Sequence, residues 1–382
     1  MKARLGLVLG ALACFGIARG LASRPGLAEI FIRPGAEISS LLSRLLSPLP
    51  FAVVEAVLVL WIGRRLFTLG RGFADVVRRR RRFRNAAASA ALVTLRDAAI
   101  LAIWFYVAWG FGYARPPLET RLGWPETPPD AATLDAIADL ASSLVDESNE
   151  RYVALHGGTD AGEPTARGDD GATDRSLEEA WLVAGRALGL PGNATGPRGR
   201  VKPLLASPLL RRLGLSGVYC PFTAEATVNA EVPAVSYPQV VAHEKSHQRG
   251  IHPEDEANFL GWFVAECSRD PLVRYSASVF AQRQLLFALL RADPDRARDL
   301  IARRHPGVQR DVNALRAYWT AAEGPAADAA RRMNDAYLRT NRVEGGIESY
   351  GRSVQLMLRW AASHDGSLRL PADDSGAATR SD

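Results

Sequence analysis

The chain has 382 residues, of which 47% are hydrophobic, and it carries a formal net charge of +6. Two or more structural units are expected at this length. Much of the basic excess lies in one run of arginines, residues 78–82, between two apolar segments. This placement argues against a nucleic-acid-binding protein and for a membrane topology signal. The three cysteines show no Cys-x-x-Cys spacing, which argues against a thiolate zinc site.

Residues 1–115 are predicted to form a membrane region, with the lipid bilayer as its partner. Three apolar runs approach the ~20 residues that a helix needs to cross the hydrocarbon core. They predict transmembrane helices at 5–21, 45–63 and 88–112. The first run could instead be a signal peptide that is removed after export. Between the first two runs, residues 23–47 mix charged residues with leucine and isoleucine at helical spacing, which predicts an amphipathic helix at the membrane interface.

The charged residues near these runs indicate the orientation. Glu55 and the Arg96–Asp97 pair could form a buried relay or an ion pair between spans. The simpler interpretation is that Glu55 pairs locally and that Arg96–Asp97 marks the interface. The arginine run at 78–82 is predicted to stay in the cytoplasm. The protein is therefore expected to be a multi-pass protein of the cell membrane, with residues 116–362 outside the cytoplasm.

The outer domain is predicted to be mostly helical. Apolar residues at helical spacing predict a helix over 131–152. Residues 157–174 are rich in Gly, Asp, Ala and Thr and predict a mobile loop. Ser176 and Glu179 have the spacing of a capping box, which predicts that a helix over 176–188 begins there.

A short β element is predicted next, because residues 216–229 combine β-branched and aromatic residues with turn formers. Cys220 lies in this stretch and could form a disulfide with Cys267 outside the cytoplasm, although the sequence does not decide this. The polar tail, residues 363–382, is predicted to be disordered. Helices are also predicted over 272–291, 294–303, 308–323, 326–339 and 347–360.

One motif points to chemistry, namely His243-Glu244-Lys-Ser-His247. Two histidines four residues apart lie on one face of a helix, so that both imidazoles can bind one ion. A glutamate directly after the first histidine lies beside that ion, where it can take a proton from a metal-activated water. The motif therefore predicts a Zn²⁺ site in which Glu244 is the general base.

The residues around the motif predict two consecutive helices. Pro238 favours the first turn of the site helix, and Gly250 its C-terminal end. Pro253 begins the next helix, which is apolar almost all round over residues 257–267 and should be buried. The turn at Gly250 lets this second helix fold back over the first.

Catalytic zinc commonly takes three protein ligands, so one more is needed. Glu254 at the start of the second helix is the preferred third ligand, and Asn258, one turn further along, could hydrogen-bond a metal-binding side chain. Glu256, Asp255, His252 and a distant acid remain alternatives. Acids at a helix start also complement the helix dipole without any metal.

A donor on another element should stabilise the oxyanion of a peptide-cleavage reaction. Tyr350, between glycines, and Tyr275 are the candidates, although either could be an ordinary core tyrosine.

Two resemblances add to this interpretation. The pattern Glu254-x-x-Ala257-Asn258 resembles the Glu-x-x-Ala-Asp signature of membrane gluzincins, the group of CaaX prenyl proteases and heat-shock membrane metallopeptidases, in which the first glutamate binds zinc. A closer resemblance is to a family of uncharacterised bacterial membrane proteins defined by a domain of unknown function. This family implies three spans and an outer zincin-like domain, but no known substrate. The segments that carry it are 109–113, 219–223, 243–250, 254–259, 274–276 and 346–350.

The sequence thus predicts a mainly α protein: N-terminal transmembrane helices, then a mostly helical zincin-like domain with a short β element beside the metal site. The predicted function is a membrane-anchored zinc metallopeptidase that hydrolyses peptide or protein substrates. The alternative is a membrane scaffold or sensor with a structural or inactive zinc site. Because structural zinc sites are closed, that alternative predicts a fourth ligand, for instance Cys220 or Glu225.

Overall fold

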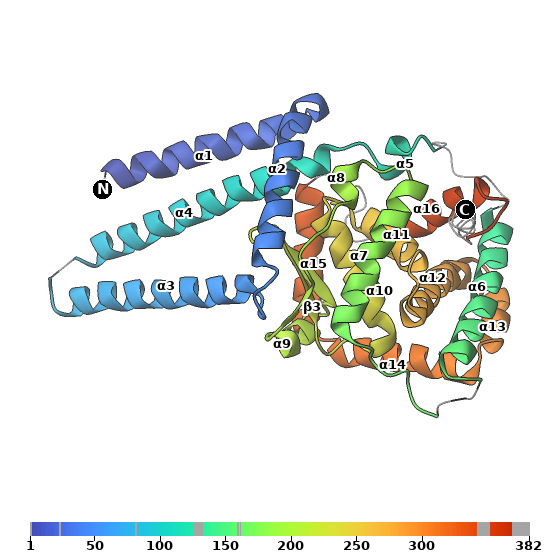
Figure 1. Cartoon of the computed structure of the whole chain (residues 1–382). Helices are drawn as coiled ribbons and strands as arrows, with labels where there is room; N and C mark the ends of the chain where they lie inside the picture. The colour runs from blue at the N-terminus through green and yellow to red at the C-terminus, as the bar shows by residue number, and fades with distance from the viewer. Residues whose placement is uncertain are drawn as a thin grey trace, which may run out of the picture.

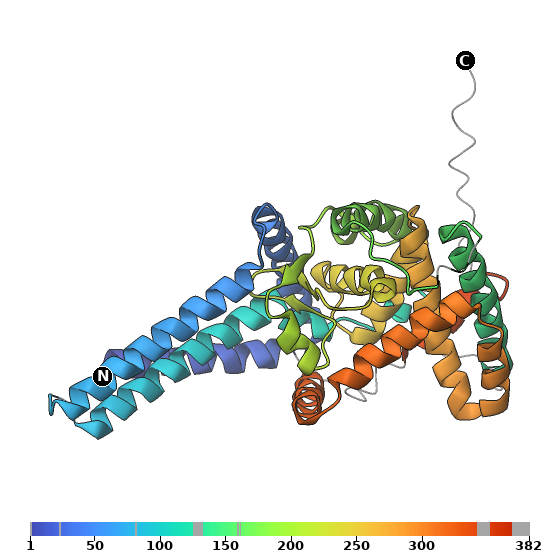
Figure 2. The same cartoon turned by 90° about the horizontal axis from the view of Figure 1, so that it is seen from below.

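The computed structural model describes residues 2–22, 24–80, 82–124, 133–158, 160, 162–341 and 352–368. These residues form a mainly helical protein with one small sheet (Figures 1 and 2). The first elements are α1 Lys2–Ala22, α2 Pro25–Leu46, α3 Val53–Val77, α4 Phe83–Ala108 and the 3-10 helix η1 Gly110–Ala114. The helices that follow are α5 Leu118–Arg121, α6 Thr133–Leu155, α7 Asp170–Ala187, α8 Gly192–Thr195, α9 Ser207–Arg212, η2 Ala234–Ser236, α10 Tyr237–Gln248, α11 Glu254–Glu266, α12 Pro271–Ala292, α13 Pro294–Ala302, α14 Pro306–Ala322, α15 Pro325–Thr340 and α16 Ser353–Ala362.

The helices α1, α3 and α4 form an arm that projects from the rest of the molecule (Figure 1). α4 packs against both α1 and α3, and α2 crosses the base of the arm. Among the described residues, one helix, Phe83–Ala108, is long and apolar enough to cross a membrane, and α1 contains a shorter apolar stretch, Leu12–Leu21.

The helix bounds in the arm correct the predicted spans at 45–63 and 88–112. α2 ends at Leu46, and α3 begins only at Val53 and continues to Val77. Pro48 and Pro50 explain this break, because proline cannot donate a helical hydrogen bond. α4 begins and ends earlier than predicted, and the residues after Trp109 form η1. The amphipathic helix predicted at 23–47 matches α2.

The elements from α5 to α16 form the site domain, which has its core around α11. Every residue from Asp255 to Ala265 is buried, which confirms the predicted burial of this helix. α11 packs against α7, α10, α12 and α16, while α12 also packs along α6. This arrangement holds α10 between α11 and the sheet.

The sheet has three strands in the order β1-β3-β2: β1 Lys202–Leu204, β2 Gly217–Cys220 and β3 Glu225–Asn229. β2 and β3 are antiparallel, with Gly217 opposite Val228, and they are the strands predicted at 216–229. β1 pairs in parallel with β3 and was not predicted. β3 is buried throughout and contacts α10, so the sheet flanks the site helix.

Two glutamates join the arm to the sheet. Glu225 of β3 accepts hydrogen bonds from the first backbone N–H groups of α3, at Val53 and Val54 (2.9 and 3.0 Å), and pairs with the buried Lys202 ammonium at 2.8 Å. In return, Glu55 of α3 accepts from the backbone of Leu205 and Ala206 (3.0 and 2.8 Å). The partners of Glu55 are therefore distant in the chain, so the predicted local pairing is not what the structure shows.

Some of the other predicted elements differ from the structure, and some agree with it. α7 begins at Asp170, with the Asp169 side chain as its N-terminal cap, so the prediction of a loop to residue 174 and a start at Ser176 is wrong. Ser176 instead shares a hydrogen bond with Ser268 (2.6 Å). The three cysteines are free, so the disulfide left open between Cys220 and Cys267 is not formed. Helices α12 to α15 lie within two residues of their predicted bounds, whereas most of the predicted tail lies outside the described residues.

Candidate metal centre

Three side chains from α10 and α11 converge on one point. His243 Nε2 and His247 Nε2 are 3.1 Å apart, and Glu254 Oε2 lies 3.2 Å from the first and 3.5 Å from the second. Among the described residues, these three form the one group of His, Cys, Asp or Glu side chains that could hold a metal ion. The structure therefore brings together both motif histidines and the preferred third ligand.

The chain reversal between the two helices makes this geometry possible. Gly250 has φ 79°, a left-handed conformation that glycine adopts without strain, and its N–H bonds the His247 carbonyl at 2.9 Å. Pro253 then precedes the first residue of α11. Gly261 lets the helices approach closely, since a Cβ there would lie 3.0 Å from the His243 backbone nitrogen. Glu254 consequently faces the two histidines.

Hydrogen bonds and charges around the ligands fix the direction of His247 and the ionisation of Glu254. His247 Nδ1 lies 2.7 Å from the Ile251 carbonyl, which fixes the ring with Nε2 toward the cluster. Burial alone would lower the pKa of His247, but the Glu254 carboxylate outweighs it and raises this pKa to about 9. Burial alone would likewise raise the pKa of Glu254, and the two imidazoles instead hold it well below its usual range. The carboxylate is thus kept ionised, as a metal ligand must be.

Glu244 lies beside this cluster and is almost fully buried. Burial outweighs the histidines and raises the pKa of Glu244 to about 7. Its Oε2 atom has no hydrogen-bond partner among the described residues. β2 passes directly over it: a Cβ on Gly217 would lie 2.6 Å from Glu244 Oε1. Any larger residue at position 217 would therefore displace the Glu244 carboxylate.

The cluster opens into a cavity of about 1100 Å³. Asn258 lines it with the three ligands, and β2 forms one wall. Phe105 and Trp109, at the end of α4, form another part of the wall. The Trp109 ring meets His247 edge-on, with the centroids 5.8 Å apart. The end of the arm and the metal cluster therefore share one cavity.

The opposite face of α10 is held by buried ion pairs. Lys245 Nζ lies 2.8 Å from Asp174 Oδ1 and 2.7 Å from Glu178 Oε1, both on α7. Arg249 pairs with Glu178 at 2.8 Å and lies over the Trp181 ring at 4.6 Å. These contacts fix the rotation of α10, and thereby the direction of His243 and His247.

The alternative ligands have other partners. Glu256 accepts from the Leu118 backbone (2.9 Å) and pairs with Arg121, and Asp255 lies 3.2 Å from Arg352 Nε. Neither belongs to the cluster.

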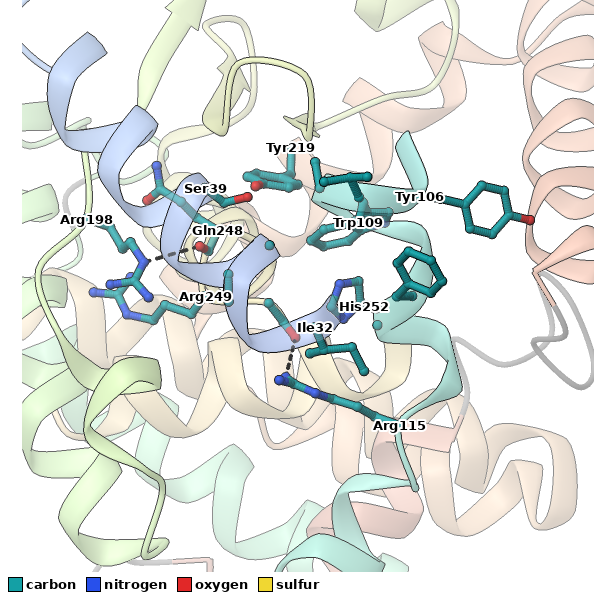
Figure 3. Close-up of a pocket in the computed structure, with 17 residues that line it drawn as sticks. Ile32, Ser39, Tyr106, Trp109, Arg115, Arg198, Tyr219, Gln248, Arg249 and His252 are labelled. Atoms are coloured by element: carbon teal, nitrogen blue, oxygen red, sulfur yellow. Dashed lines mark hydrogen bonds between the residues drawn. The ribbon is translucent and has the colours of Figure 1, made fainter. Parts of the chain in front are cut away.

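His252 lies in a small pocket beneath η1 (Figure 3). Its ring packs on Trp109 with the centroids 3.9 Å apart, and a Cβ on Gly112 would lie only 1.9 Å from it. Arg115 and Gly250 border the same pocket and share a hydrogen bond of 3.4 Å. Burial lowers the pKa of His252 well below its usual value, so the ring is neutral. It packs next to the site and is not one of the ligands.

Tyr275, one of the two predicted tyrosines, does not join the site. Tyr275 is fully buried in a separate cluster, where its hydroxyl donates to Asp311 at 2.7 Å, and it does not line the cavity. Asp311 also accepts from Thr165, which anchors part of the predicted mobile loop. Tyr350 lies outside the described residues.

Three other tyrosines, Tyr113, Tyr219 and Tyr337, line the cavity, and none of them was among the predicted site residues. Tyr113 of η1 and Tyr337 of α15 share a hydrogen bond of 3.0 Å between their hydroxyls. Burial raises the pKa of Tyr337 to about 12, and the Glu254 charge adds to this. Both hydroxyls therefore remain protonated near the cluster. No sequence spacing links them to the motif, because they come from opposite ends of the chain.

The chain matches the model of a known protein family. A family model described as "Protein of unknown function (DUF3810)" matches residues 36–358. The chain belongs to this family, an uncharacterised one as the resemblance implied. No curated protein and no solved structure matches the chain.

Proposed function

We propose that this protein is a membrane-anchored zinc metallopeptidase with its site in the cavity between α10, α11 and β2. The observation that carries the proposal is the convergence of His243, His247 and Glu254, with the buried Glu244 beside them. A pair of histidines with a carboxylate, and a second carboxylate next to the first histidine, is the residue set of a hydrolytic zinc site.

The distances within the cluster suit zinc. A tetrahedral ion with ligands about 2.0 Å away spaces them about 3.3 Å apart, and the three separations here are 3.1, 3.2 and 3.5 Å. Cys220 and Glu225, the fourth ligands considered for a closed structural site, are not in the cluster among the described residues. Glu225 is instead paired with Lys202. Three protein ligands leave one position open, which favours catalysis over a structural role.

The residues around the cluster would have the following roles in hydrolysis. When bound, Zn²⁺ supplies a Lewis acid that polarises a carbonyl and acidifies water. Glu244 takes a proton from the attacking water and delivers it to the leaving amine. Its buried position beside the cluster lets one carboxyl group serve both transfers. Asn258, in the cavity wall, would hydrogen-bond a metal-binding side chain, and the hydroxyl pair of Tyr113 and Tyr337 would offer the donor for the developing oxyanion.

The arm would anchor the protein in a bilayer. α4 meets the length and composition of a span, and α3 exposes most of its apolar side chains, including Phe67 and Phe73. We propose that α1, α3 and α4 all cross the membrane, with the arginine-rich turn between α3 and α4 in the cytoplasm. The site domain, at the opposite end of α4, then lies outside the cytoplasm and directly at the membrane surface.

The test is Glu244→Gln in the purified full chain. The variant should bind zinc as the wild type does and lose at least a hundredfold in hydrolysis of unstructured peptides, because amide nitrogen cannot accept the proton. Zinc content by elemental analysis and peptide cleavage by mass spectrometry are measured together. Unchanged cleavage by Glu244→Gln would contradict the mechanism.

A further inference from the structure

Arg283 of α12 lines the same cavity as the metal ligands. Among the described residues its guanidinium has no hydrogen bond and no ion pair, and burial lowers its pKa with no carboxylate to oppose it. Two other arginines with little exposure are paired with acids, Arg151 with Glu266 at 2.6 Å and Arg249 with Glu178 at 2.8 Å. Because arginine stays protonated in proteins, an unpaired guanidinium in a cavity lacks the anion that would offset its desolvation.

A second guanidinium strengthens the positive charge at this end of the cavity. Burial and the nearby Arg283 lower the pKa of Arg304 to about 10. The hydrogen bonds of Arg304 go to two neutral amides, Gln282 at 2.8 Å and Gln309 at 3.2 Å. Thus neither arginine is neutralised by an acid in the described part of the chain. An anion bound in the cavity would relieve their repulsion.

Helix packing relates Arg283 to the metal ligands. The Gln239 backbone N–H, one turn before His243, donates to Ser276 Oγ at 3.2 Å, so α10 begins against Ser276. Ser276, Phe280 and Arg283 line the cavity from one face of α12. Arg283 lies seven residues beyond Ser276, or about 10 Å along the helix. An extended peptide covers this distance in about three residues.

The cavity wall offers a further unsatisfied polar group. Neither the oxygen nor the nitrogen of the buried Gln239 side chain has a hydrogen-bond partner among the described residues. Much of the remaining wall toward Arg283 is apolar, including Val279, Leu315 and Trp319. A polar, negatively charged occupant would therefore be positioned by a few groups in an apolar channel, as is usual for specific ligands.

We propose that Arg283 binds a carboxylate of the substrate, so that the enzyme acts on peptides with an acidic side chain or a free C-terminus a few residues from the cleaved bond. This inference rests on the proposed peptidase function. Guanidinium fits a carboxylate with two parallel hydrogen bonds, which gives both affinity and register along the cavity.

The experiment uses the zinc-loaded full chain in detergent and random decapeptide libraries. One library contains Asp and Glu, and a matched library contains Asn and Gln in their place. Each library is made once with a free C-terminus and once with an amidated C-terminus. The variants are Arg283→Gln and Arg283→Lys. Arg291→Gln, at an exposed position of the same helix outside the cavity, is the matched control. Cleavage gives kcat and KM, and fluorescence anisotropy of labelled libraries on Glu244→Gln, with and without Arg283→Gln, gives binding without turnover.

The wild type should prefer carboxylate-bearing peptides at least tenfold, the scale of one charge-assisted hydrogen bond. Arg283→Gln should remove this preference by raising KM, Arg283→Lys should keep part of it, and Arg291→Gln should keep all of it. The amidated libraries show whether the carboxylate is C-terminal or a side chain. Cleavage without any carboxylate preference overturns the inference and leaves the peptidase function standing. Arg283-dependent binding without cleavage supports the carboxylate site while contradicting the peptidase function, and neither binding nor cleavage contradicts both.

Discussion

The arm and the site domain distribute their side chains in opposite ways. In α3 no residue is buried, and Phe73 is 71% exposed. In the site domain Lys245 is 0% and Arg249 4% exposed, and both are paired with acids of α7. An apolar exterior is stable only in apolar surroundings, whereas a charged interior is stable only when paired. The stability of the arm therefore depends on its surroundings, whereas the stability of the site depends on the ion pairs between α7 and the C-terminal part of α10.

The largest effect is expected from Glu178→Ala, which tests whether the site domain depends on the buried ion pairs. It leaves Lys245 and Arg249 with one acid fewer, and breaking a buried pair costs about 3–5 kcal/mol. Urea unfolding of the full chain should show this loss of unfolding free energy, and zinc affinity should fall because α10 is released. Glu179→Ala, at the exposed neighbouring position, is the control and should change little. Equal effects of the two variants would contradict the role given to the ion pairs.

The arm is tested by placing a charge on its exposed surface. Leu95→Lys near the middle of α4 should disfavour membrane insertion by about 3 kcal/mol. Phe287→Lys, at an exposed apolar position of α12, should have no effect on insertion. The measurement is the fraction of chain retained in alkali-washed membranes. Retention of Leu95→Lys at the wild-type level would show that α4 does not lie in lipid.

The ion pairs also predict a pH dependence. Burial alone would raise the pKa of Glu178, but Arg249 and Lys245 lower it from 4.5 to about 2. A depressed pKa gives stability that is complete above pH 4.5 and is lost as the pH falls toward 2. The stability difference between wild type and Glu178→Gln should therefore shrink below pH 4.5, by about 3 kcal/mol in all. A difference that stays constant from pH 6 to pH 3 would contradict this pairing.

A smaller effect is expected at the strand above the site. Gly217→Ala places a Cβ within 2.6 Å of Glu244 Oε1 and must displace that carboxylate. Hydrolysis should fall about tenfold, corresponding to about 1.4 kcal/mol, while zinc binding stays unchanged. Gly214→Ala would be a poor control, because Gly214 has φ 71°. Gly192→Ala, with open space around its Cβ, is the better one. Loss of zinc in Gly217→Ala would show that Gly217 supports the ligands themselves.

The sequence was sufficient for the parts of the site that are local in the chain. The two histidines and Glu254 span twelve residues, and Gly250 and Pro253 determine the turn between them. Helix spacing and turn chemistry therefore predicted their convergence. The short β element was predicted for the same reason, but the pairing of its two strands was not.

Contacts between distant segments were beyond such reasoning. Asp169 and Ser176 are both suitable caps, and only packing decides that α7 begins at Asp170. Tyr275 was a reasonable candidate until the fold directed its hydroxyl toward Asp311. Tyr113, Tyr337 and Arg283 line the cavity because the fold gathers α12, α15 and the end of α4 around the cluster.

The most direct test of the account is the metal content of the purified full chain, wild type against His247→Ala. The wild type should hold about one zinc per chain after exposure to equimolar zinc and dialysis, because three ligands are already positioned. His247→Ala should hold almost none under the same treatment, while His252→Ala should keep its zinc. A wild type without zinc, or a His247→Ala variant that retains it, would contradict the central claim.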